Sequence, residues 1–338
     1  MTKILVTGAT GFLASHLILQ LIERGYDVRG TVRNLEKGVR LQQALSEYAG
    51  KPISIEFVLA DLNSDDGWAR AVDGVTFVQH VASPFPPGQP KGPEELIRPA
   101  KDGALRVLKA ARDATVKRVV LTSSVAAVDT GWDEYPSAGY DETHWAKLDD
   151  PQRASFYAQS KALAERASWD FIESDGQGLE LAVINPVGIL GPAISENVST
   201  SFGTVVGPLS GKMPGYPRIH QAIVDVRDVA AAHIEAMLRP EAAGERFIVS
   251  DEALWFSEIG ALLAKAFPDR VLPNTEIPDE QIKVAAETNA ALKSLLPNLG
   301  RCRPYNNTKA REVLGIDFIS AQDALRASAE SALKLGLI

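Results

Sequence analysis

The sequence predicts an α/β fold in which a doubly wound parallel sheet carries a smaller, mostly helical lobe. Short apolar runs alternate with segments of helical periodicity through the first half of the 338-residue chain, and this alternation is typical of βαβ units. The composition, 45% hydrophobic and 23% charged residues, is that of a globular protein with a full core. A chain of this length is expected to hold about two domains.

The expected elements follow one another in the order that a parallel sheet requires. In the first helix Leu13, Leu17 and Leu21 recur at helical spacing and mark one buried stripe. Strands are expected at Ile4–Thr7, Asp27–Val32, Ile53–Leu59, Thr76–Val81, Arg118–Thr122 and Leu179–Asn185. The helices between them are expected at Phe12–Arg24, Leu35–Tyr48, Pro93–Ala114 and Gln152–Glu173.

The pattern changes after Asn185. Residues 186–217 are rich in Gly, Pro and Ser and predict irregular loops with one short helix. A strand-helix-strand pattern then returns at Ile223-Val224, Val226–Leu238 and Phe247–Val249, and later helices are expected at Phe256–Phe267, Asp279–Leu296 and Ala321–Leu335. We therefore expect one domain from residues 1–185 plus about 219–250, and a second lobe from residues 186–218 plus about 251–338.

Charge and hydropathy exclude two classes of partner. With 35 Lys and Arg against 43 Asp and Glu the net charge is −8, and without a basic patch such a chain repels nucleic acid. No segment approaches the roughly 20 apolar residues of a membrane helix. The absence of a leader pattern and the single cysteine, Cys302, favour a cytoplasmic protein in a reducing compartment.

A glycine-rich turn follows the first expected strand and opens the first helix. It reads Thr7-Gly8-Ala9-Thr10-Gly11-Phe12-Leu13-Ala14, a G-x-x-G-x-x-A pattern whose first glycine stands one residue earlier than in G-x-G-x-x-G. Gly8 and Gly11 allow a tight turn and the close approach of a pyrophosphate, while the helix N-terminus offers free N–H groups. The strand before it and the helix after it make this a Rossmann-type dinucleotide-binding fingerprint.

The end of the second expected strand selects between NAD and NADP. NAD-binding sheets place Asp or Glu there to accept a hydrogen bond from the ribose 2′-hydroxyl. This chain has Arg33, whose guanidinium can bind a 2′-phosphate and stack on adenine. Lys37 and Arg40 follow. A role in phosphate binding and a role as solvated charges on a helix explain these two residues equally well. The sequence therefore predicts NADP(H).

Three residues form a candidate catalytic set. Tyr157 and Lys161 stand four residues apart on one expected helix, so both face the same way. A phenol is a poor acid–base group until a neighbouring ammonium favours its charged form. Ser124 follows the fifth strand, at the edge where the active sites of open parallel sheets lie. Ser123 is the alternative to Ser124, and either serine can also be interpreted as a strand-end cap.

Together these motifs resemble the extended short-chain dehydrogenase/reductases. The same resemblance extends to Asp61-Leu62 after the third strand and His80-Val81-Ala82-Ser83-Pro84 after the fourth. Within that family the chain resembles the dihydroflavonol 4-reductase-like branch, which also holds cinnamoyl-CoA reductases and microbial NADPH-dependent aldehyde and ketone reductases. Thr31-Val32-Arg33 and Asn185-Pro186-Val187-Gly188-Ile189-Leu190-Gly191-Pro192 resemble this branch in particular.

The resemblance implies a role for each matching residue. Ser124, Tyr157 and Lys161 are expected to be the catalytic triad of an oxidoreductase, with no metal site. NADP(H) is expected to contact Thr7, Gly8, Thr10, Gly11, Phe12, Leu13, Arg33, Lys37, Asp61, Leu62, Val81, Ala82, Ser83, Thr122, Tyr157, Lys161, Pro186, Val187, Ile189 and Ser201. The substrate pocket is expected to include Phe85, Val125 and Asp129.

Three other residues are given structural interpretations. His80 lies within a strand run and is expected to be a packed core histidine. Asp225 and Asp228 flank the start of Val226–Leu238, where helix capping explains them.

Departures from the family patterns bear on the substrate. Ala154-Ser155-Phe156-Tyr157-Ala158 replaces the Asn-Trp-Tyr-Cys-Tyr run of cinnamoyl-CoA reductases. Asp129 stands where plant flavonoid enzymes typically place Asn. Both departures argue against those substrates and favour a microbial NADPH-dependent carbonyl reductase, a monomer or homodimer that acts on a hydrophobic or aromatic small molecule.

Two alternatives share the fold. NAD-retaining nucleotide-sugar epimerases and dehydratases generally carry an acidic residue after the second strand and a Val-Tyr-Gly run after the serine, whereas this chain has Arg33 and Val125-Ala126-Ala127. Non-catalytic NADPH-sensing proteins tend to lose the tyrosine or the lysine, and both are present here. The reductase is therefore the favoured function.

Overall fold

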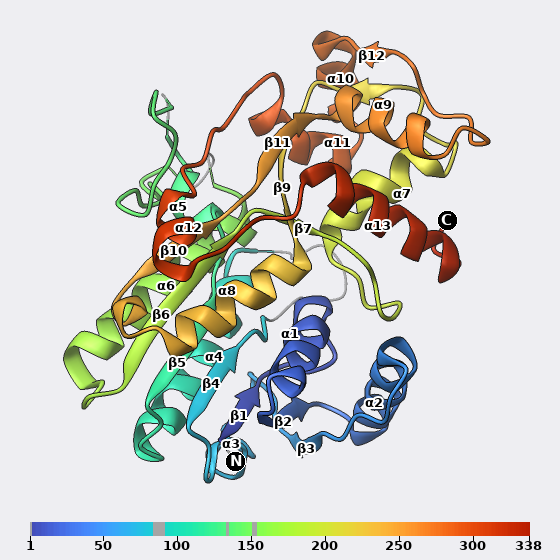
Figure 1. The fold of residues 1–338 in the computed structure, drawn as a ribbon. Helices are drawn as coiled ribbons and strands as arrows, with labels where there is room; N and C mark the ends of the chain where they lie inside the picture. Colours follow the sequence, from blue (N-terminus) through green and yellow to red (C-terminus); the bar gives the residue numbers. More distant parts are fainter. Residues whose placement is uncertain (1, 84–91, 133–134, 151–153) are drawn as a thin grey trace.

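Seven parallel strands form the central sheet in the computed structural model, which describes residues 2–83, 92–132, 135–150 and 154–338 (Figure 1). Their order is β3-β2-β1-β4-β5-β6-β10, and the order reverses between β1 and β4. This arrangement confirms the predicted doubly wound α/β fold. The strands are β1 Lys3–Val6, β2 Asp27–Val32, β3 Glu56–Leu59, β4 Phe77–His80, β5 Arg118–Thr122, β6 Glu180–Pro186 and β10 Arg246–Val249.

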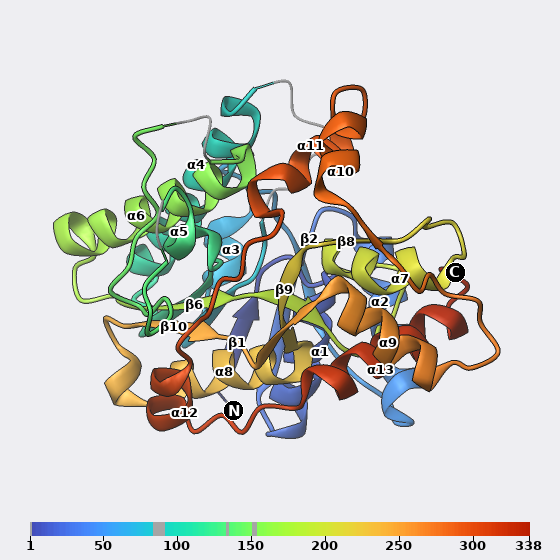
Figure 2. The same ribbon diagram turned by 90° about the horizontal axis from the view of Figure 1, so that it is seen from above.

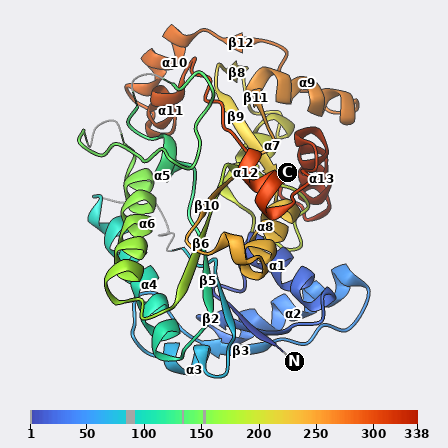
Figure 3. The same cartoon turned by 60° about the vertical axis from the view of Figure 1, so that its left-hand side comes forward.

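Helices cover both faces of this sheet because the strands are apolar on both sides. In β5, Val119 and Leu121 belong to one core cluster and Val120 to the other, as strand alternation requires. Figure 3 shows α4 and α6 on one face and α1 and α8 on the other. The helices are α1 Phe12–Glu23, α2 Leu35–Ala49 and α8 Val226–Leu238 on one face, and α3 Trp68–Val72, α4 Glu94–Asp113 and α6 Phe156–Asp175 on the other.

The second lobe lies beyond the carboxyl ends of the strands (Figures 1 and 2). It contains a three-stranded sheet in the order β11-β9-β7 and a two-stranded pair, β12 and β8. Its strands are β7 Gly188–Leu190, β8 Tyr216–Pro217, β9 His220–Asp225, β11 Glu252–Trp255 and β12 Glu276–Ile277. Its helices include α7 Gly203–Leu209, α9 Phe256–Ala266, α10 Asp279–Ala286, α11 Ala290–Leu295 and α13 Ala321–Lys334, while α12 Thr308–Leu314 packs beside β10 and α8.

Some expected elements differ from those observed, each for a local reason. The strand expected at Ile53–Leu59 is paired only from Glu56, because side chains of α2 bind the earlier amides: Ser46 Oγ accepts from Ile53 N–H and Gln42 Oε1 from Ile55 N–H, both at 3.0 Å. The helix expected at Asp279–Leu296 is divided into α10 and α11. The second begins after Asn289, whose Oδ1 accepts from Leu292 N–H at 3.3 Å, as a capping side chain does.

The returning segment also divides between the sheets. The strand expected at Ile223-Val224 belongs to β9 and pairs with β7 and β11 rather than with the central sheet. The strand expected at Phe247–Val249 does join the central sheet, as β10 beside β6. Helix α8 between them packs against α1 and the central strands. Elements without a counterpart among the predicted ones include helices α3 and α12 and strands β7, β8, β11 and β12.

Candidate active site at the carboxyl edge of the sheet

The carboxyl ends of the parallel strands bring four predicted site segments to one edge. Gly8 follows β1, Ala82 follows β4, Ser124 follows β5, and Pro186 ends β6. Because all these strands are parallel and adjacent, their carboxyl ends share that edge. The order of strands reverses beside β1, and ligands of doubly wound sheets bind at such a switch point.

Gly8 is held in a left-handed conformation and in a tight space, both of which disfavour a side chain. Its φ is +62°, and a Cβ there would lie 3.0 Å from the Cα atom of Ala82. Its N–H donates to Thr31 Oγ1 at 2.9 Å. Thr7 is wholly buried, and its hydroxyl oxygen accepts the N–H groups of Val81 and Ala82 at 3.1 and 3.0 Å. Thr7 therefore joins the β1 and β4 loops, and Gly8 lets the backbone lie close to them.

The N-terminus of α1 carries the features of an anion site. Gly11 is the N-cap and supplies no side-chain hydrogen bond to the first turn, so the helix offers N–H groups to a ligand. The Phe12 ring packs edge-to-face on Phe202 with 5.2 Å between centroids, which places the short helical turn Thr200–Phe202, with Ser201, against this end of α1. Thr10 is half-buried at the turn, whereas Leu13 is buried in the core.

Arg33 and Lys37 extend the same edge past β2. Both side chains are exposed, and neither forms an ion pair within the part of the chain that the structure describes. Asn34 between them caps α2 by accepting from Glu36 N–H at 2.7 Å. Two unpaired cations beside an uncapped helix N-terminus fit a ligand with a pyrophosphate and a further phosphate.

Asp61 and Leu62, in the loop that follows β3, differ from each other in what they contact. The Asp61 carboxylate accepts from the backbone N–H and the side-chain amide of Asn63 at 2.8 and 3.1 Å. Leu62 packs against α4, where a Cβ on Gly103 would lie 2.9 Å from Leu62 Cβ. Asp61 thus stabilises its own turn, and Leu62 offers a half-buried apolar side chain.

Tyr157 and Lys161 lie in the first two turns of α6, next to the end of β5. Lys161 Nζ lies 5.9 Å from the centroid of the Tyr157 ring and donates to the carbonyl oxygen of Thr122 at 3.4 Å. Ser155 caps the helix, accepting from Ala158 N–H at 3.1 Å. The Tyr157 side chain is 42% exposed. The ammonium therefore lies between the phenol and the strand that leads to Ser124.

The geometry distinguishes the two serines after β5. Ser123 is buried, and its hydroxyl donates to the carboxylate of Glu165. The hydroxyl oxygen of Ser124 accepts from Ala126 N–H at 3.2 Å and makes no other contact that commits its proton within the described residues. Ser124 is therefore the serine whose hydroxyl is available to a substrate oxygen.

Two buried histidines behind these residues are neutral. Burial and, to a smaller extent, the Lys161 ammonium lower the pKa of His80 to about 3. Burial likewise lowers the pKa of His233 to about 3. His80 Nδ1 lies 2.8 Å from Thr7 Oγ1, and His233 Nε2 lies 2.9 Å from Thr122 Oγ1. His80 is thus the packed core histidine that the sequence predicts, and His233 fixes the side chain of Thr122.

Apolar residues follow the carboxyl ends of these strands. Val187 is buried, while Val81, Ala82, Val125 and Ile189 are half-buried. The remaining predicted contacts differ in exposure: Pro186 is buried, Ser201 is half-buried, and Ser83 is exposed. Phe85, predicted to line the substrate pocket, lies outside the described residues.

Asp129 contacts the chain segment before α12 rather than open space. It ends the short helix α5 (Ala126–Asp129) and is buried. Its Oδ2 accepts from Arg303 at 3.0 Å and from the Tyr305 hydroxyl at 2.6 Å. Burial and the Asp129 charge raise the pKa of Tyr305 well above its ordinary value, so this phenol remains a donor. The carboxylate predicted to contact substrate is therefore bound by side chains of the segment before α12.

The two aspartates near α8 have different roles. Asp225 caps the helix as expected, accepting from Arg227 N–H at 2.8 Å. The cap predicted at Asp228 is wrong, because its Oδ2 accepts instead from Ile319 N–H at 2.8 Å and so holds the segment before α13.

Sequence reasoning missed a buried polar cluster behind Ser124. Glu165, Asn185 and Arg246 form it, and they come from α6, β6 and β10. The available signal was a polar residue in otherwise small or apolar surroundings, such as Asn185 at the end of Leu181-Ala182-Val183-Ile184.

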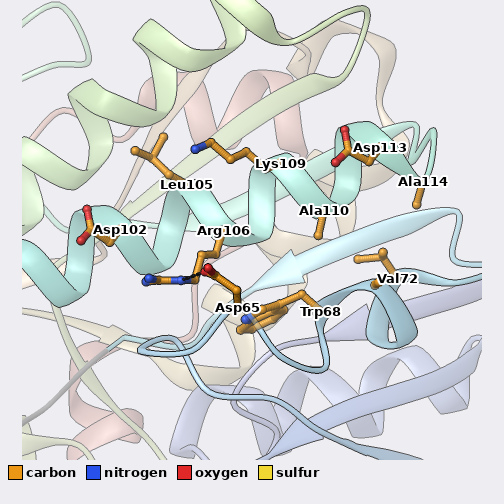
Figure 4. A pocket seen from close by; sticks show the side chains of 11 residues that line it. Asp65, Trp68, Val72, Asp102, Leu105, Arg106, Lys109, Ala110, Asp113 and Ala114 are labelled. Carbon is orange, nitrogen blue, oxygen red and sulfur yellow. Dashed lines mark hydrogen bonds and ion pairs between the residues drawn. The ribbon is translucent and has the colours of Figure 1, made fainter.

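A groove of about 640 Å³ lies elsewhere, between α3 and α4 (Figure 4). It is lined by Trp68, Leu105 and Lys109, among others, and is bridged by the ion pair between Arg106 and Asp65. None of the predicted site residues that the structure describes lines it. In the described ranges, no helix is both long and apolar enough to span a bilayer.

Comparison with known proteins agrees with this geometry. The model of the NAD dependent epimerase/dehydratase family matches residues 4–250. Cinnamoyl-CoA reductase 1 of Arabidopsis thaliana is 35% identical over 333 residues, covering 98% of this chain and 89% of that protein. A putative NADPH-dependent methylglyoxal reductase, GRP2 of Candida albicans, is 33% identical and covers 96% of each chain.

A solved structure gives the same relationship. The yeast methylglyoxal/isovaleraldehyde reductase Gre2, in complex with NADPH, superposes with a TM-score of 0.79 at 27% identity and covers 99% of both chains. The family match spans both the glycine turn and the Tyr157–Lys161 pair. The chain therefore belongs to the NAD dependent epimerase/dehydratase family, as an extended short-chain dehydrogenase/reductase of the dihydroflavonol 4-reductase-like branch.

Proposed function

We propose that this protein is an NADPH-dependent carbonyl reductase that converts a hydrophobic or aromatic aldehyde or ketone into the alcohol. It is an oxidoreductase of C=O and CH–OH groups that uses NADP(H), as its reductase relatives indicate. The observation that carries the proposal is the convergence of an exposed Tyr157, the Lys161 ammonium and the strand leading to Ser124. A phenol beside an ammonium and a free hydroxyl suits protonation of a developing alkoxide.

The catalytic residues have different tasks. Bound NADPH would supply the hydride that reduces the carbonyl carbon. Ser124 donates a hydrogen bond to the carbonyl oxygen, and Tyr157 donates the proton that this oxygen gains. Lys161 stabilises the phenolate that remains and holds the nicotinamide ribose. The backbone at Gly8 and the α1 N-terminus would hold the pyrophosphate, and Arg33, assisted by Lys37, the 2′-phosphate.

The side chains near the strand ends favour an apolar carbonyl compound. Half-buried Val125 and Ile189 lie near the strand ends, and the Asp129 carboxylate at the end of α5 is paired with Arg303. We infer that residues 186–218 and 251–338 supply most of the remaining wall. Relatives named as reducing cinnamoyl-CoA, methylglyoxal and isovaleraldehyde support the same reaction with different substrates. The departures at Ala154–Phe156 argue against a CoA thioester for this chain.

One assay tests the proposal. Purified protein is mixed with NADPH and a panel of aliphatic and aromatic aldehydes and ketones, and loss of the reduced-nicotinamide absorbance is followed. We expect oxidation of NADPH with at least one aromatic carbonyl and much slower oxidation of NADH. No reaction on any carbonyl, together with tightly co-purifying NAD, would indicate an epimerase or dehydratase instead. NADPH binding without any turnover would indicate a sensor.

A further inference from the structure

A fully buried carboxylate lies one helical turn beyond Lys161. The side chain of Glu165 is 0% exposed. Its Oε2 accepts from the Ser123 hydroxyl and, at 2.8 Å, from the Asn185 amide, while its Oε1 accepts from Arg246 Nε at 2.5 Å. A buried carboxylate is tolerated only when donors satisfy it in this way.

The donors come from elements that are far apart in sequence and also hold Ser124. Ser123 immediately precedes Ser124, and the Asn185 amide donates a second bond, 3.2 Å long, to the Ser124 carbonyl oxygen. Glu165 itself belongs to α6, the helix that carries Tyr157. The carboxylate therefore joins the segment of one catalytic hydroxyl to the helix of the other.

Arg246 fixes the other side of the carboxylate. It lies on β10, the outermost strand beside β6 in the central sheet. It donates to the carbonyl oxygens of Glu142 and His144, both at 2.9 Å. Its guanidinium carbon lies 3.7 Å from the centroid of the Trp145 ring. A guanidinium held on three sides keeps Glu165 in one position.

We propose that Glu165, held by Arg246, is a positioning residue that sets the separation of the Ser124 and Tyr157 hydroxyls. Both hydroxyls must reach one substrate oxygen, yet one belongs to the β5 loop and the other to α6. A misplacement of about 1 Å in such a pair can cost on the order of 100-fold in rate. The inference rests on the proposed function, because it concerns how the same two hydroxyls act together.

The chain supplies a matched control at the amino ends of the strands, on the side of the sheet opposite to the candidate active site. Arg118, at the start of β5, is buried and pairs with Glu180, at the start of β6, with 2.6 Å between Nη2 and Oε2. This pair also links β5 to a neighbouring strand, but it contacts no predicted site residue. A variant that lacks this ion pair therefore reports the effect of lost stability alone.

The experiment compares four variants: Glu165→Gln and Arg246→Lys near the site, and Glu180→Gln and Arg118→Lys as controls. For Glu165→Gln we expect kcat to fall by on the order of 10- to 100-fold, with KM and the NADPH Kd within about twofold of wild type. Arg246→Lys keeps the charge and is expected to lower kcat by about fivefold, since an ammonium cannot reproduce the several fixed N–H donors of the guanidinium. The controls are expected to lose thermal stability with kcat within about twofold of wild type.

Hydrogen exchange gives a readout that needs no turnover. In Arg246→Lys and Glu165→Gln we expect faster amide exchange at residues 122–125 and 156–161 than in the two controls. If Glu165→Gln does not fold, Arg246→Lys carries the test because it retains the ion pair. An unchanged kcat in the site variants, an equal loss of kcat in the controls, or unchanged exchange at both segments would each overturn the inference. If wild-type protein reduces no carbonyl, the proposed function fails while the exchange data still decide whether Glu165 holds the two segments together.

Discussion

The two edges of the central sheet are built from similar residues that are used in opposite ways. At the amino edge Arg118 pairs with Glu180 and donates to the carbonyl oxygens of Ala236 and Arg239, which end α8. At the carboxyl edge Arg33 is exposed and has no ion-pair partner within the described residues. One cation is paired within the protein, and the other is the one that we propose binds the cofactor.

Helix direction explains this difference. In a doubly wound fold the C-termini of the covering helices lie at the amino edge, where their carbonyl groups need donors. Arg29 supplies three such bonds to the carbonyl oxygens of Arg70, Ala71 and Asp73, at 2.7 to 3.0 Å. Helix N-termini lie at the other edge, and that of α1 is left without a side-chain cap. We therefore expect the amino edge to contribute stability and the carboxyl edge to contribute binding and catalysis.

The largest expected effect belongs to the carboxyl edge. Tyr157→Phe removes the proton donor and should lower kcat by about 10²- to 10⁴-fold, with NADPH affinity, measured by fluorescence titration, unchanged. Tyr48→Phe is the matched control, because Tyr48 is 50% exposed against 42% for Tyr157. Retention of normal turnover in Tyr157→Phe would remove the proposed mechanism.

The next effect belongs to the amino edge. Arg118→Met leaves the last carbonyl groups of α8 and the Glu180 carboxylate without their donor, so the free energy of unfolding should fall by about 3–5 kcal/mol. Denaturant unfolding measures the loss, and kcat below the melting transition should be unchanged. Arg326→Met, which breaks the exposed pair with Glu330, should cost at most about 1 kcal/mol. A large drop in kcat for Arg118→Met would contradict the division between the edges.

A smaller effect tests cofactor choice. Arg33→Ala should weaken NADPH binding by about 10- to 100-fold, which corresponds to the loss of a charge-assisted contact of about 1.5–3 kcal/mol. NADH affinity should hardly change, because NADH has no 2′-phosphate. Arg98→Ala, which removes an exposed charge on α4, controls for net charge. Equal weakening of both nucleotides would show that Arg33 does not read the 2′-phosphate.

The smallest effect concerns α8, which joins the two edges. Burial raises the pKa of Asp228 from 3.8 to about 7, although Ile319 N–H donates to its carboxylate and opposes the shift. A raised folded pKa means that the stability from this group is full below the unfolded pKa near 4 and is lost as pH rises towards 7. Asp228→Asn should therefore gain melting temperature relative to wild type between pH 5 and pH 8.

The difference in melting temperature between Asp228→Asn and wild type separates the contribution of Asp228 from that of the buried histidines. The lowered pKa values of His80 and His233 act in the opposite direction, because their stability is lost as pH falls below the unfolded value of 6.5. The exposed Asp317→Asn variant controls for removal of a surface charge near Ile319. A constant difference in melting temperature between wild type and Asp228→Asn from pH 5 to pH 8 would refute the prediction.

Features carried by short stretches of sequence were predicted well. The parallel sheet followed from apolar runs between helical repeats, and the turn around Gly8 lies where the strand-turn-helix order requires. The Tyr157–Lys161 pair lies on one helix face because helical geometry fixes the spacing of residues four apart. Prediction was weaker where side chains of other elements replaced the expected bonds, as Gln42 and Ser46 did for the amides of Ile53 and Ile55.

The sequence by itself determined the fold class, the glycine turn, Arg33 after β2 and the tyrosine–lysine pair, since each depends on periodicity or on neighbours along the chain. Only the tertiary structure decided which serine is free, where Asp129 points and what holds Ser124 in place. Those answers depend on partners distant in sequence: Arg246 lies 81 residues from Glu165, and Arg303 lies 174 residues from Asp129. Such contacts leave no periodic signal, because burial and charge pairing are properties of the folded chain.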